Sequence, residues 1–485
     1  MTYVRPHPEG LPIGADHLVW AETAQTEPVF FPFDGSEVAA APVGTAAHAD
    51  QALATAFAAR PEMEALSSGR RRALLLAVHD ALAERRAAFE ELLVLETGKP
   101  LVDCRTEMAR TLTTWSAAAE EAARLHGETV PLDLQPQGEG MLGYYTRRPA
   151  GVVVGIAGFN YPLLLASHKL APAIAAGCPI ILKPSPDAPL SALWAVHLIR
   201  ELLASHGITP GAVQLVTGGA ETGEALVTDP RAAVISFTGS AAVGHRIARA
   251  AAPRKVLLEL GSNTGLIVAG DANLPAAVDA VIRGGFYANG QACISVQRVM
   301  LAESIAEAFE DLLLSRLHEV RAGDPREEST RLAEVINTAA AARILSWVKD
   351  AVNGGARLLA GGTAEGRSVA ATVLADVPPE SPVWCEEVFG PVVCLQRVPD
   401  FAAAIDSVNR SRYGLHAAVY TASLKNAFAA INALDVGSVV VNEIPGFRSD
   451  IMPYGGVKDS GLGREGPRYA IEEFTVTRMA LIRPE

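Results

Sequence analysis

Cysteine is scarce in this sequence of 485 residues, and the five that occur are far apart and form no CxxC pair: Cys104, Cys178, Cys293, Cys385 and Cys394. Secreted disulfide frameworks need regularly paired cysteines, so this pattern favours a reducing compartment. Clusters of cysteine and histidine with zinc spacing are missing too, as is HExxH. We therefore predict a cytoplasmic protein without a metal site.

Long apolar runs and an excess of positive charge are also absent. Apolar stretches such as 151–159 are well short of the roughly 20 residues that span a bilayer, and residues 1–8 lack the apolar core of a signal peptide. The formal net charge of −13 disfavours nucleic acid or an anionic membrane as the main partner. The composition is that of an ordinary soluble globular enzyme. The net charge says nothing about small substrates, because local fields can oppose it.

The usual glycine signatures of nucleotide and hydrolase sites do not occur: there is no GxGxxG, no Walker A loop and no GxSxG. Glycine-bearing turns nevertheless follow three predicted strands, at 155–160, 218–223 and 237–244. Each can present backbone amides at a helix N-terminus to a phosphate. One such turn usually only closes a loop, whereas three in one sheet indicate a nucleotide site.

Strands and helices are predicted to alternate in two regions, after an alanine-rich helical segment at 46–126. The first region has apolar strands at 151–157, 179–183, 213–217, 233–237 and 256–260. This pattern is typical of a mostly parallel sheet with helices on both faces. The same alternation returns over 264–442, so we predict two α/β domains.

Cys293 and Glu259 are the candidate nucleophile and base. Cys293 lies in a polar, glycine-containing segment, where a loop or helix-start position would favour a thiolate. Glu259 interrupts an apolar run, and a buried carboxylate must be paired, protonated or functional. The alternatives are an inert cysteine and an ion pair of Glu259 with Lys255 or Arg254.

Seven motifs along the chain resemble those of the NAD(P)-dependent aldehyde dehydrogenase superfamily. The similarity runs over roughly residues 28–480 and keeps the family's order, which makes chance agreement negligible. The motifs are Phe159-Asn160-Tyr161-Pro162, Lys183-Pro184-Ser185, Phe237-Thr238-Gly239-Ser240 with Gly244, Glu259-Leu260-Gly261, Gly290-Gln291 with Cys293, Glu386 to Pro391, and Pro453 to Gly461.

The resemblance implies roles for three catalytic side chains. Cys293 would attack the aldehyde carbon, and hydride transfer to the nicotinamide would leave a thioester. The Asn160 amide would bind the oxyanion, and Glu259 would activate water to hydrolyse the thioester. Lys183 and Glu387 would hold the two riboses. The full set implied around NAD or NADP is Ile156, Ala157, Lys183, Ser185, Gly219, Gly223, Phe237, Gly239, Ser240, Leu260, Glu387 and Phe389.

The implied fold is α/β of the aldehyde dehydrogenase type, with two Rossmann-type domains and a small β flap for oligomerisation. The expected bounds are 1–128 and 150–260 for the cofactor-binding domain, 261–456 for the catalytic domain, and 129–149 with 470–485 for the flap. The resemblance implies a homodimer or homotetramer, and the edge strands of the flap need such a partner. The expected substrate is a small-molecule aldehyde, and neither nucleic acid nor membrane is an expected partner.

Two other functional classes stay open beside hydrolytic oxidation. A CoA-acylating aldehyde dehydrogenase would pass the thioester to CoA, but that class usually lacks the glutamate found here at Glu259. A non-catalytic binding protein on this fold would not need Cys293, Glu259 and Asn160 together.

The cofactor preference is open as well. Many NAD-preferring relatives have a glutamate three residues after the lysine, where this chain has Pro186. Ser185 and Lys183 suit a 2′-phosphate, whereas the nearby Asp187 does not.

The resemblance places the substrate pocket around seven residues: Arg110, Thr114, Trp115, Tyr161, Ile294, Phe447 and Arg448. Trp115 and Tyr161 suit an aromatic or aliphatic aldehyde. An inward-pointing Arg110 or Arg448 would instead predict a substrate with an anionic tail, because guanidinium binds such groups bidentately. The alternatives are an Arg110–Glu107 pair on a helix surface, and an Arg448 that is solvent-exposed or paired with Asp450.

Overall fold

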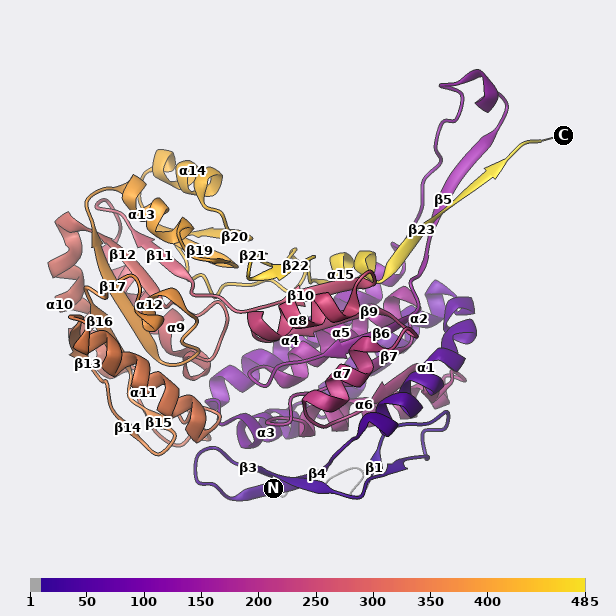
Figure 1. Ribbon diagram of the computed structural model, residues 1–485, viewed down its shortest axis with the longest axis horizontal. Coiled ribbons are helices and arrows are strands. Elements are labelled where there is room, and N and C mark those ends of the chain that lie inside the picture. Colours follow the sequence, from indigo (N-terminus) through magenta and orange to yellow (C-terminus); the bar gives the residue numbers. More distant parts are fainter. Residues whose placement is uncertain (1–9, 485) are drawn as a thin grey trace.

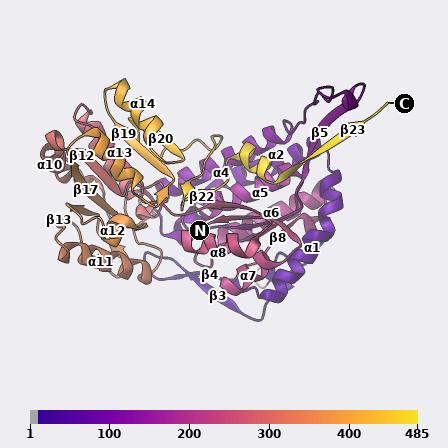
Figure 2. The same cartoon turned by 45° about the horizontal axis from the view of Figure 1, so that its top comes forward.

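The computed structural model describes residues 10–484, so residues 1–9 of the predicted cofactor-binding segment and Glu485 of the predicted flap lie outside it. Two α/β halves lie side by side, and a two-stranded ribbon projects from one of them (Figure 1, Figure 2). No helix within residues 10–484 is both long and apolar enough to cross a membrane.

The first half is built on a six-stranded sheet of order β22-β10-β9-β6-β7-β8. Its strands are β6 Val152–Ile156, β7 Ile180–Lys183, β8 Val213–Leu215, β9 Ala232–Thr238, β10 Lys255–Glu259 and β22 Gly461–Leu462. All neighbouring pairs are parallel except β10 with β22. The five strands predicted from apolar runs are therefore confirmed, and they form one sheet.

Helices cover both faces of this sheet (Figure 1). They are α1 Ala46–Ala65, α2 Ser68–Glu84, α3 Arg86–Thr97, α4 Leu101–Ala122, α5 Pro162–Ala176, α6 Leu190–Ser205, α7 Ala220–Thr228 and α8 Ala241–Ala251. Helix α5 is buried along its whole length, between the sheet and α4. The predicted helical segment at 46–126 is confirmed as α1 to α4.

The second half contains a seven-stranded sheet of order β13-β16-β17-β12-β11-β19-β20. Its strands are β11 Gly265–Val268, β12 Arg298–Ala302, β13 Arg357–Ala360, β16 Thr372–Ala375, β17 Val392–Val398, β19 His416–Tyr420 and β20 Ser438–Val441. Only β13 runs antiparallel. The packed helices are α9 Leu274–Phe286, α10 Ala306–Arg316, α11 Thr338–Asn353, α13 Phe401–Asn409 and α14 Leu424–Ala433.

The chain crosses from one sheet to the other over residues 260–264, so the end of β10 faces the second half. The projecting ribbon pairs β5 Leu142–Pro149 with β23 Thr475–Ile482 in antiparallel register. The remaining short elements are β1 Gly10–Leu11, β2 Ala21–Glu22, β3 Thr26–Phe30, β4 Glu37–Pro42, α12 Pro382–Cys385, β14 Ala364–Glu365, β15 Ser368–Val369, β18 Tyr413–Gly414, β21 Val457–Lys458 and α15 Pro467–Glu473.

A buried ion pair ties α4 to the helix that follows β6. Glu107 is fully buried and pairs with Lys99, while its other oxygen accepts hydrogen bonds from the amides of Leu163 and Leu164 at 3.0 and 3.1 Å. The carboxylate thus caps the N-terminus of α5 from a different helix. The Lys99 ammonium also lies 3.8 Å from the centre of the Tyr161 ring.

We expect Glu107→Gln to destabilise the fold by about 3–5 kcal/mol, because it leaves the Lys99 charge buried without a counter-charge. Glu120→Gln is the matched control, since Glu120 on the same helix pairs with Arg72 at the surface; it should cost about 0–1 kcal/mol. Urea unfolding of both variants measures the difference, and equal effects would contradict this account of the pair.

Candidate active site

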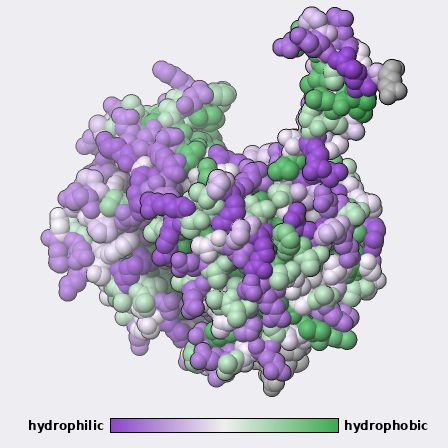
Figure 3. All heavy atoms as spheres, turned by 45° about the vertical axis from the view of Figure 1, so that its right-hand side comes forward, coloured by the Kyte–Doolittle hydropathy of each residue, from purple (hydrophilic) through white to green (hydrophobic). Residues whose placement is uncertain are grey.

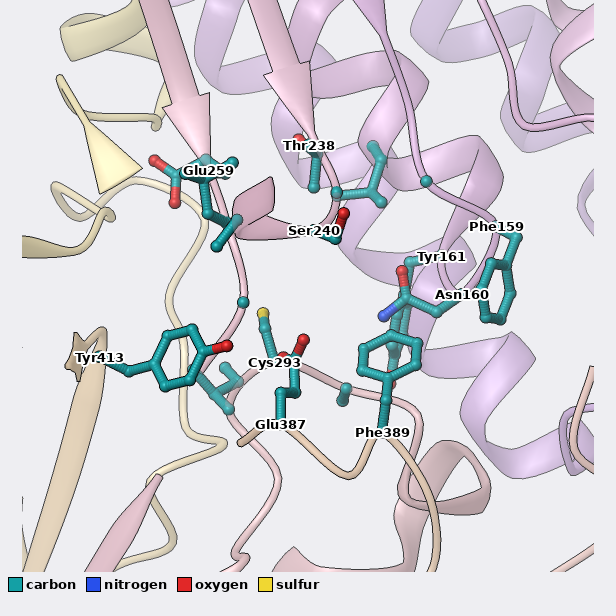
Figure 4. Close-up of a pocket in the computed structure, with 18 of the residues that line it drawn as sticks. Phe159, Asn160, Tyr161, Thr238, Ser240, Glu259, Cys293, Glu387, Phe389 and Tyr413 are labelled. Carbon is teal, nitrogen blue, oxygen red and sulfur yellow. The ribbon is translucent and has the colours of Figure 1, made fainter. Parts of the chain in front are cut away.

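One cavity of about 490 Å³ lies between the two halves, at the carboxyl ends of β6, β9 and β10. Both halves contribute residues to its wall, and Figure 4 shows Asn160, Ser240 and Glu259 from the first half opposite Cys293 and Glu387 from the second. Ligands of open α/β sheets bind at this end of the strands. The three catalytic residues predicted from the sequence therefore line a single cavity.

A tight turn presents Cys293 to the cavity. Ala288, Asn289 and Gly290 all have positive φ, between 48° and 69°. A Cβ on Gly290 would lie 2.3 Å from the backbone of Gly390, so only glycine fits there. The buried Asn289 amide bonds the carbonyls of Gly98 and Glu334 at 3.1 and 2.8 Å. Cys293 follows in a turn, not at a helix start, so no helix N-terminus assists its thiolate.

Burial raises the pKa of Cys293 to about 11, and the negative charges of Glu387 and Glu259 add to this effect. Tyr454 opposes it, because its hydroxyl oxygen lies 3.1 Å from Sγ, and so does the charge of Arg448. The thiol therefore needs a hydrogen-bond donor or a base beside it to react as a thiolate.

Glu259 is buried at the end of β10, with 4% of its surface exposed. Burial and the neighbouring Glu465 raise the pKa of Glu259 well above its usual range, against the charges of Arg448, Lys169 and Arg464. Neither carboxylate oxygen has a hydrogen-bond partner among residues 10–484. A base in this environment accepts a proton readily.

The ion pairs that would have given Glu259 a purely structural role do not form. Lys255 pairs with Glu473 at 3.0 Å, and the Arg254 guanidinium donates to backbone carbonyls. Asn160 follows β6, and its amide Nδ2 donates to the Gln291 carbonyl at 2.8 Å, next to the Cys293 turn.

A buried network of charged groups forms the wall behind Glu259. Glu465 contacts Lys169 at 3.3 Å, His168 at 3.2 Å and Arg448 at 3.4 Å. Burial alone would raise the pKa of Glu465, but these neighbours, Lys169 first among them, hold it below its usual range. The carboxylate therefore stays charged and balances part of the positive charge around it.

The second carboxylate of the network is Asp450. Arg110 bonds it bidentately through Nε and Nη2, at 3.0 and 2.8 Å, and His168 Nε2 lies 3.4 Å away. Burial alone would raise the pKa of Asp450. Hydrogen bonding by His168 and Arg110 outweighs burial and lowers this pKa below its usual range. Arg110 is thus paired with Asp450, and the alternative pair with Glu107 does not form.

Four of the seven expected pocket residues line the cavity: Arg110, Tyr161, Ile294 and Arg448. Thr114 and Trp115 do not. Both are buried residues of α4, and Trp115 donates to the hydroxyl of Ser167 on α5 at 3.0 Å. Phe447 is 55% exposed and also lies outside the cavity wall. Arg448 is not solvent-exposed: 5% of its side chain is accessible, and its closest approach to Asp450 is 3.8 Å.

Five of the expected cofactor residues line the same cavity: Gly239, Ser240, Leu260, Glu387 and Phe389. The other seven lie outside this wall, at the ends of β6 to β9 or in the segments that follow them: Ile156, Ala157, Lys183, Ser185, Gly219, Gly223 and Phe237. Burial raises the pKa of Glu387 to about 7, and its carboxylate accepts from the Ser262 amide at 2.9 Å.

The residues beyond the cavity fit a dinucleotide. The Lys183 ammonium is buried with no carboxylate partner in the described part of the chain, and burial lowers its pKa to about 8. Helix α8 begins after Ser240 without a side-chain cap, so its first amides are open to a phosphate. The open amides match the pyrophosphate of NAD(P), and the buried ammonium matches a ribose hydroxyl of NAD or the 2′-phosphate of NADP.

Sequence reasoning missed four members of the site: His168, Asp450, Tyr454 and Glu465. The structure places His168 in the cavity wall between two carboxylates. The one available signal was the run of ionisable residues in the otherwise apolar segment 162–176.

Comparison with known proteins gives the same assignment along the whole chain. The model of the aldehyde dehydrogenase family matches residues 20–480. The 3-sulfolactaldehyde dehydrogenase of Priestia megaterium is 38% identical over 464 residues, 96% of each chain. Aldehyde dehydrogenase 21 from Physcomitrella patens, solved with the reaction product succinate, has a TM-score of 0.93 at 35% identity and 99% coverage of both chains.

A third relative is the glyceraldehyde-3-phosphate dehydrogenase GapN from Methanocaldococcus jannaschii, solved with NADP. It has a TM-score of 0.91 at 33% identity, over 95% of this chain and 100% of that one. These matches confirm the predicted α/β fold class of the aldehyde dehydrogenase type. The chain belongs to the aldehyde dehydrogenase family, and it is an oxidoreductase that oxidises aldehydes with NAD or NADP.

Proposed function

We propose that the enzyme releases its product as a carboxylic acid, by hydrolysis of a thioester on Cys293. The observation that carries this proposal is the buried Glu259 carboxylate, which has no hydrogen-bond partner and lines the cavity that contains Cys293. Cys293 attacks the aldehyde carbon, and its electron pair forms the new carbon–sulfur bond. Asn160 and the Cys293 amide donate to the oxyanion.

The bound nicotinamide supplies the hydride acceptor for the oxidation. Ser240 and the open amides of α8 would hold the pyrophosphate, Lys183 and Glu387 the two riboses, and Phe389 would pack near the nicotinamide. Glu259 then takes a proton from water, the resulting hydroxide attacks the thioester carbon, and the carbon–sulfur bond breaks with its electron pair returning to sulfur.

We expect wild-type enzyme to form acid from an aldehyde and NAD(P)+ without CoA, whereas Glu259→Gln should slow turnover about 100-fold or more. The wild-type hydrolysis rate should rise with pH through the raised pKa of Glu259, because the base acts deprotonated. Stopped-flow absorbance should show one rapid equivalent of NAD(P)H in the variant, followed by slow turnover.

Acid that forms only when CoA is supplied would overturn hydrolysis. No NAD(P)H with either cofactor, across a panel of aldehydes and with freshly reduced enzyme, would favour the binding-protein alternative. Cys293→Ser is the control for both outcomes, since it should abolish the rapid phase.

We also propose that the substrate is a small aldehyde with an anionic tail. Arg110 and Arg448 both line the cavity. Arg448 is almost fully buried, and its Nε has no hydrogen-bond partner. A buried donor of this kind is costly unless a ligand satisfies it. The related enzymes named for sulfolactaldehyde and glyceraldehyde-3-phosphate, and the complex with succinate, all involve anionic compounds.

Arg448→Met should lower kcat/KM for an ω-carboxy aldehyde about 10- to 100-fold, since a hydrogen bond to a charged group contributes about 1.5–3 kcal/mol. A neutral aldehyde of equal chain length should lose clearly less, because it loses only the effect of Arg448 on Cys293 and Glu259. Arg464→Met is the matched control, because Arg464 bonds carbonyls outside the cavity wall. Equal losses on both substrates would exclude recognition of the tail by Arg448.

We further propose a homo-oligomer in the cytoplasm, with the domain bounds given above and the ribbon as the oligomerisation flap. Strand β20 forms an open edge of the seven-stranded sheet, and the β5–β23 ribbon belongs to neither sheet. Figure 3 shows apolar side chains along the ribbon, where Leu142, Val476 and Leu481 are about half exposed. Open edges and apolar patches of this kind support pairing with a second copy.

Light scattering should therefore give a multiple of the 50.9 kDa chain mass. Leu481→Glu should shift the mass towards the monomer, because it places a charge in the proposed contact. Leu358→Glu on β13, at the opposite edge of the sheet, should not. A wild-type mass equal to one chain would refute the proposal.

A further inference from the structure

Tyr454 contacts the sulfur atom of the candidate nucleophile, and the mechanism above gives it no task. Its hydroxyl oxygen lies 3.1 Å from Cys293 Sγ, within hydrogen-bond distance for sulfur. The side chain is buried, with 3% of its surface exposed, and it lines the cavity. No other hydrogen bond to the Cys293 side chain occurs among residues 10–484.

The position of the Tyr454 ring is fixed from several sides. Its backbone forms an antiparallel bridge with Glu465, through hydrogen bonds of 3.0 and 2.6 Å. The Arg448 guanidinium lies 3.6 Å from the ring centre, and the His416 ring packs against it at 5.1 Å. The next residue, Gly455, has no side chain at the point where a Cβ would lie 3.0 Å from a Glu259 oxygen. The segment Tyr454-Gly455 therefore places the Tyr454 phenol beside Cys293 Sγ and leaves space for the Glu259 carboxylate.

We propose that Tyr454 is a further catalytic residue, whose phenol donates a hydrogen bond to the Cys293 thiolate before attack and again when the thiolate leaves the thioester. Before attack the bond stabilises the negative charge that forms on sulfur when the thiol loses its proton. On attack an electron pair of the sulfur forms the carbon–sulfur bond, and the negative charge moves from sulfur to the carbonyl oxygen. On hydrolysis that bond breaks, the pair returns to sulfur, and the same phenol stabilises it.

The direction of the hydrogen bond follows from the surroundings of the phenol. Burial, the charge on Cys293 and the charge on Glu259 raise the pKa of Tyr454 well above its usual range, although Arg448 opposes the shift. The phenol thus keeps its proton near neutral pH, and a thiolate, which carries no proton, can only accept the hydrogen bond. The proton of the Cys293 thiol goes to a base, and Tyr454 transfers none.

The other groups that face this pair are Glu259, Glu387, Arg448, Tyr287 and His416. The two carboxylates disfavour the thiolate, Arg448 favours it, and burial lowers the pKa of His416 to about 4, so that it stays neutral. Of these groups, only Tyr454 lies within hydrogen-bond distance of the sulfur.

The test is the rate at which iodoacetamide alkylates Cys293, followed over a range of pH by mass spectrometry of the Cys293 peptide. Tyr454→Phe should move the midpoint up by about one pH unit and slow alkylation about tenfold below it. Tyr287→Phe is the matched control, because Tyr287 lines the same cavity without a hydrogen bond to Sγ; it should keep the wild-type midpoint.

An unshifted midpoint in folded Tyr454→Phe would overturn the inference. If that variant fails to fold, 3-fluorotyrosine at position 454 replaces it: its more acidic phenol should lower the midpoint, and an unchanged or higher midpoint would overturn the inference. The inference rests on the proposed nucleophile. Absence of labelling at Cys293 in the wild type would defeat that proposal, whereas labelling with an unshifted midpoint would defeat only the role of Tyr454.

Discussion

Burial of charge next to a reactive thiol is the constraint on which the rest of this structure depends. Glu259 lies in the interior without a hydrogen-bond partner among residues 10–484. Burial also raises the pKa of the Cys293 thiol. Removing charges from water is costly unless they are paired. Behind the base, Lys169, Arg448 and Arg110 are therefore matched by Glu465 and Asp450, which stay charged. Glu259 has no hydrogen-bond partner among residues 10–484, and this leaves its oxygens available to a water molecule.

The scaffold holds this arrangement through contacts that are far apart in sequence. The Cys293 turn is fixed by Asn289, which bonds segments near residues 98 and 334. Glu107 caps α5, the helix that contributes His168 and Lys169. The cavity is completed only where the end of β10 meets the second half and the segment at 444–465 folds back over it. The backbone that positions these side chains is thus held by contacts with elements that are distant in sequence.

Much of this could be read from the sequence, and the rest could not for a physical reason. Apolar runs predicted five of the six strands of the first sheet, and ordered motifs pointed to Cys293, Glu259 and Asn160. The network depends instead on pairs such as His168 with Asp450 and Cys293 with Tyr454, which no local pattern reveals. Trp115 illustrates the opposite error, because this α4 residue was expected in the pocket but packs against α5, where it donates to the Ser167 hydroxyl. Arg110 reaches the cavity because its side chain is long.

The central claim is that Cys293 carries the acyl group and that Glu259-activated water removes it. Peptide mass spectrometry of Glu259→Gln tests this most directly, after it is mixed with an ω-carboxy aldehyde and NAD(P)+ and quenched in acid. The account predicts an acyl mass on the Cys293 peptide, and on no other cysteine. NAD(P)H formation with an unmodified Cys293, or with the acyl group on Cys385, would contradict it.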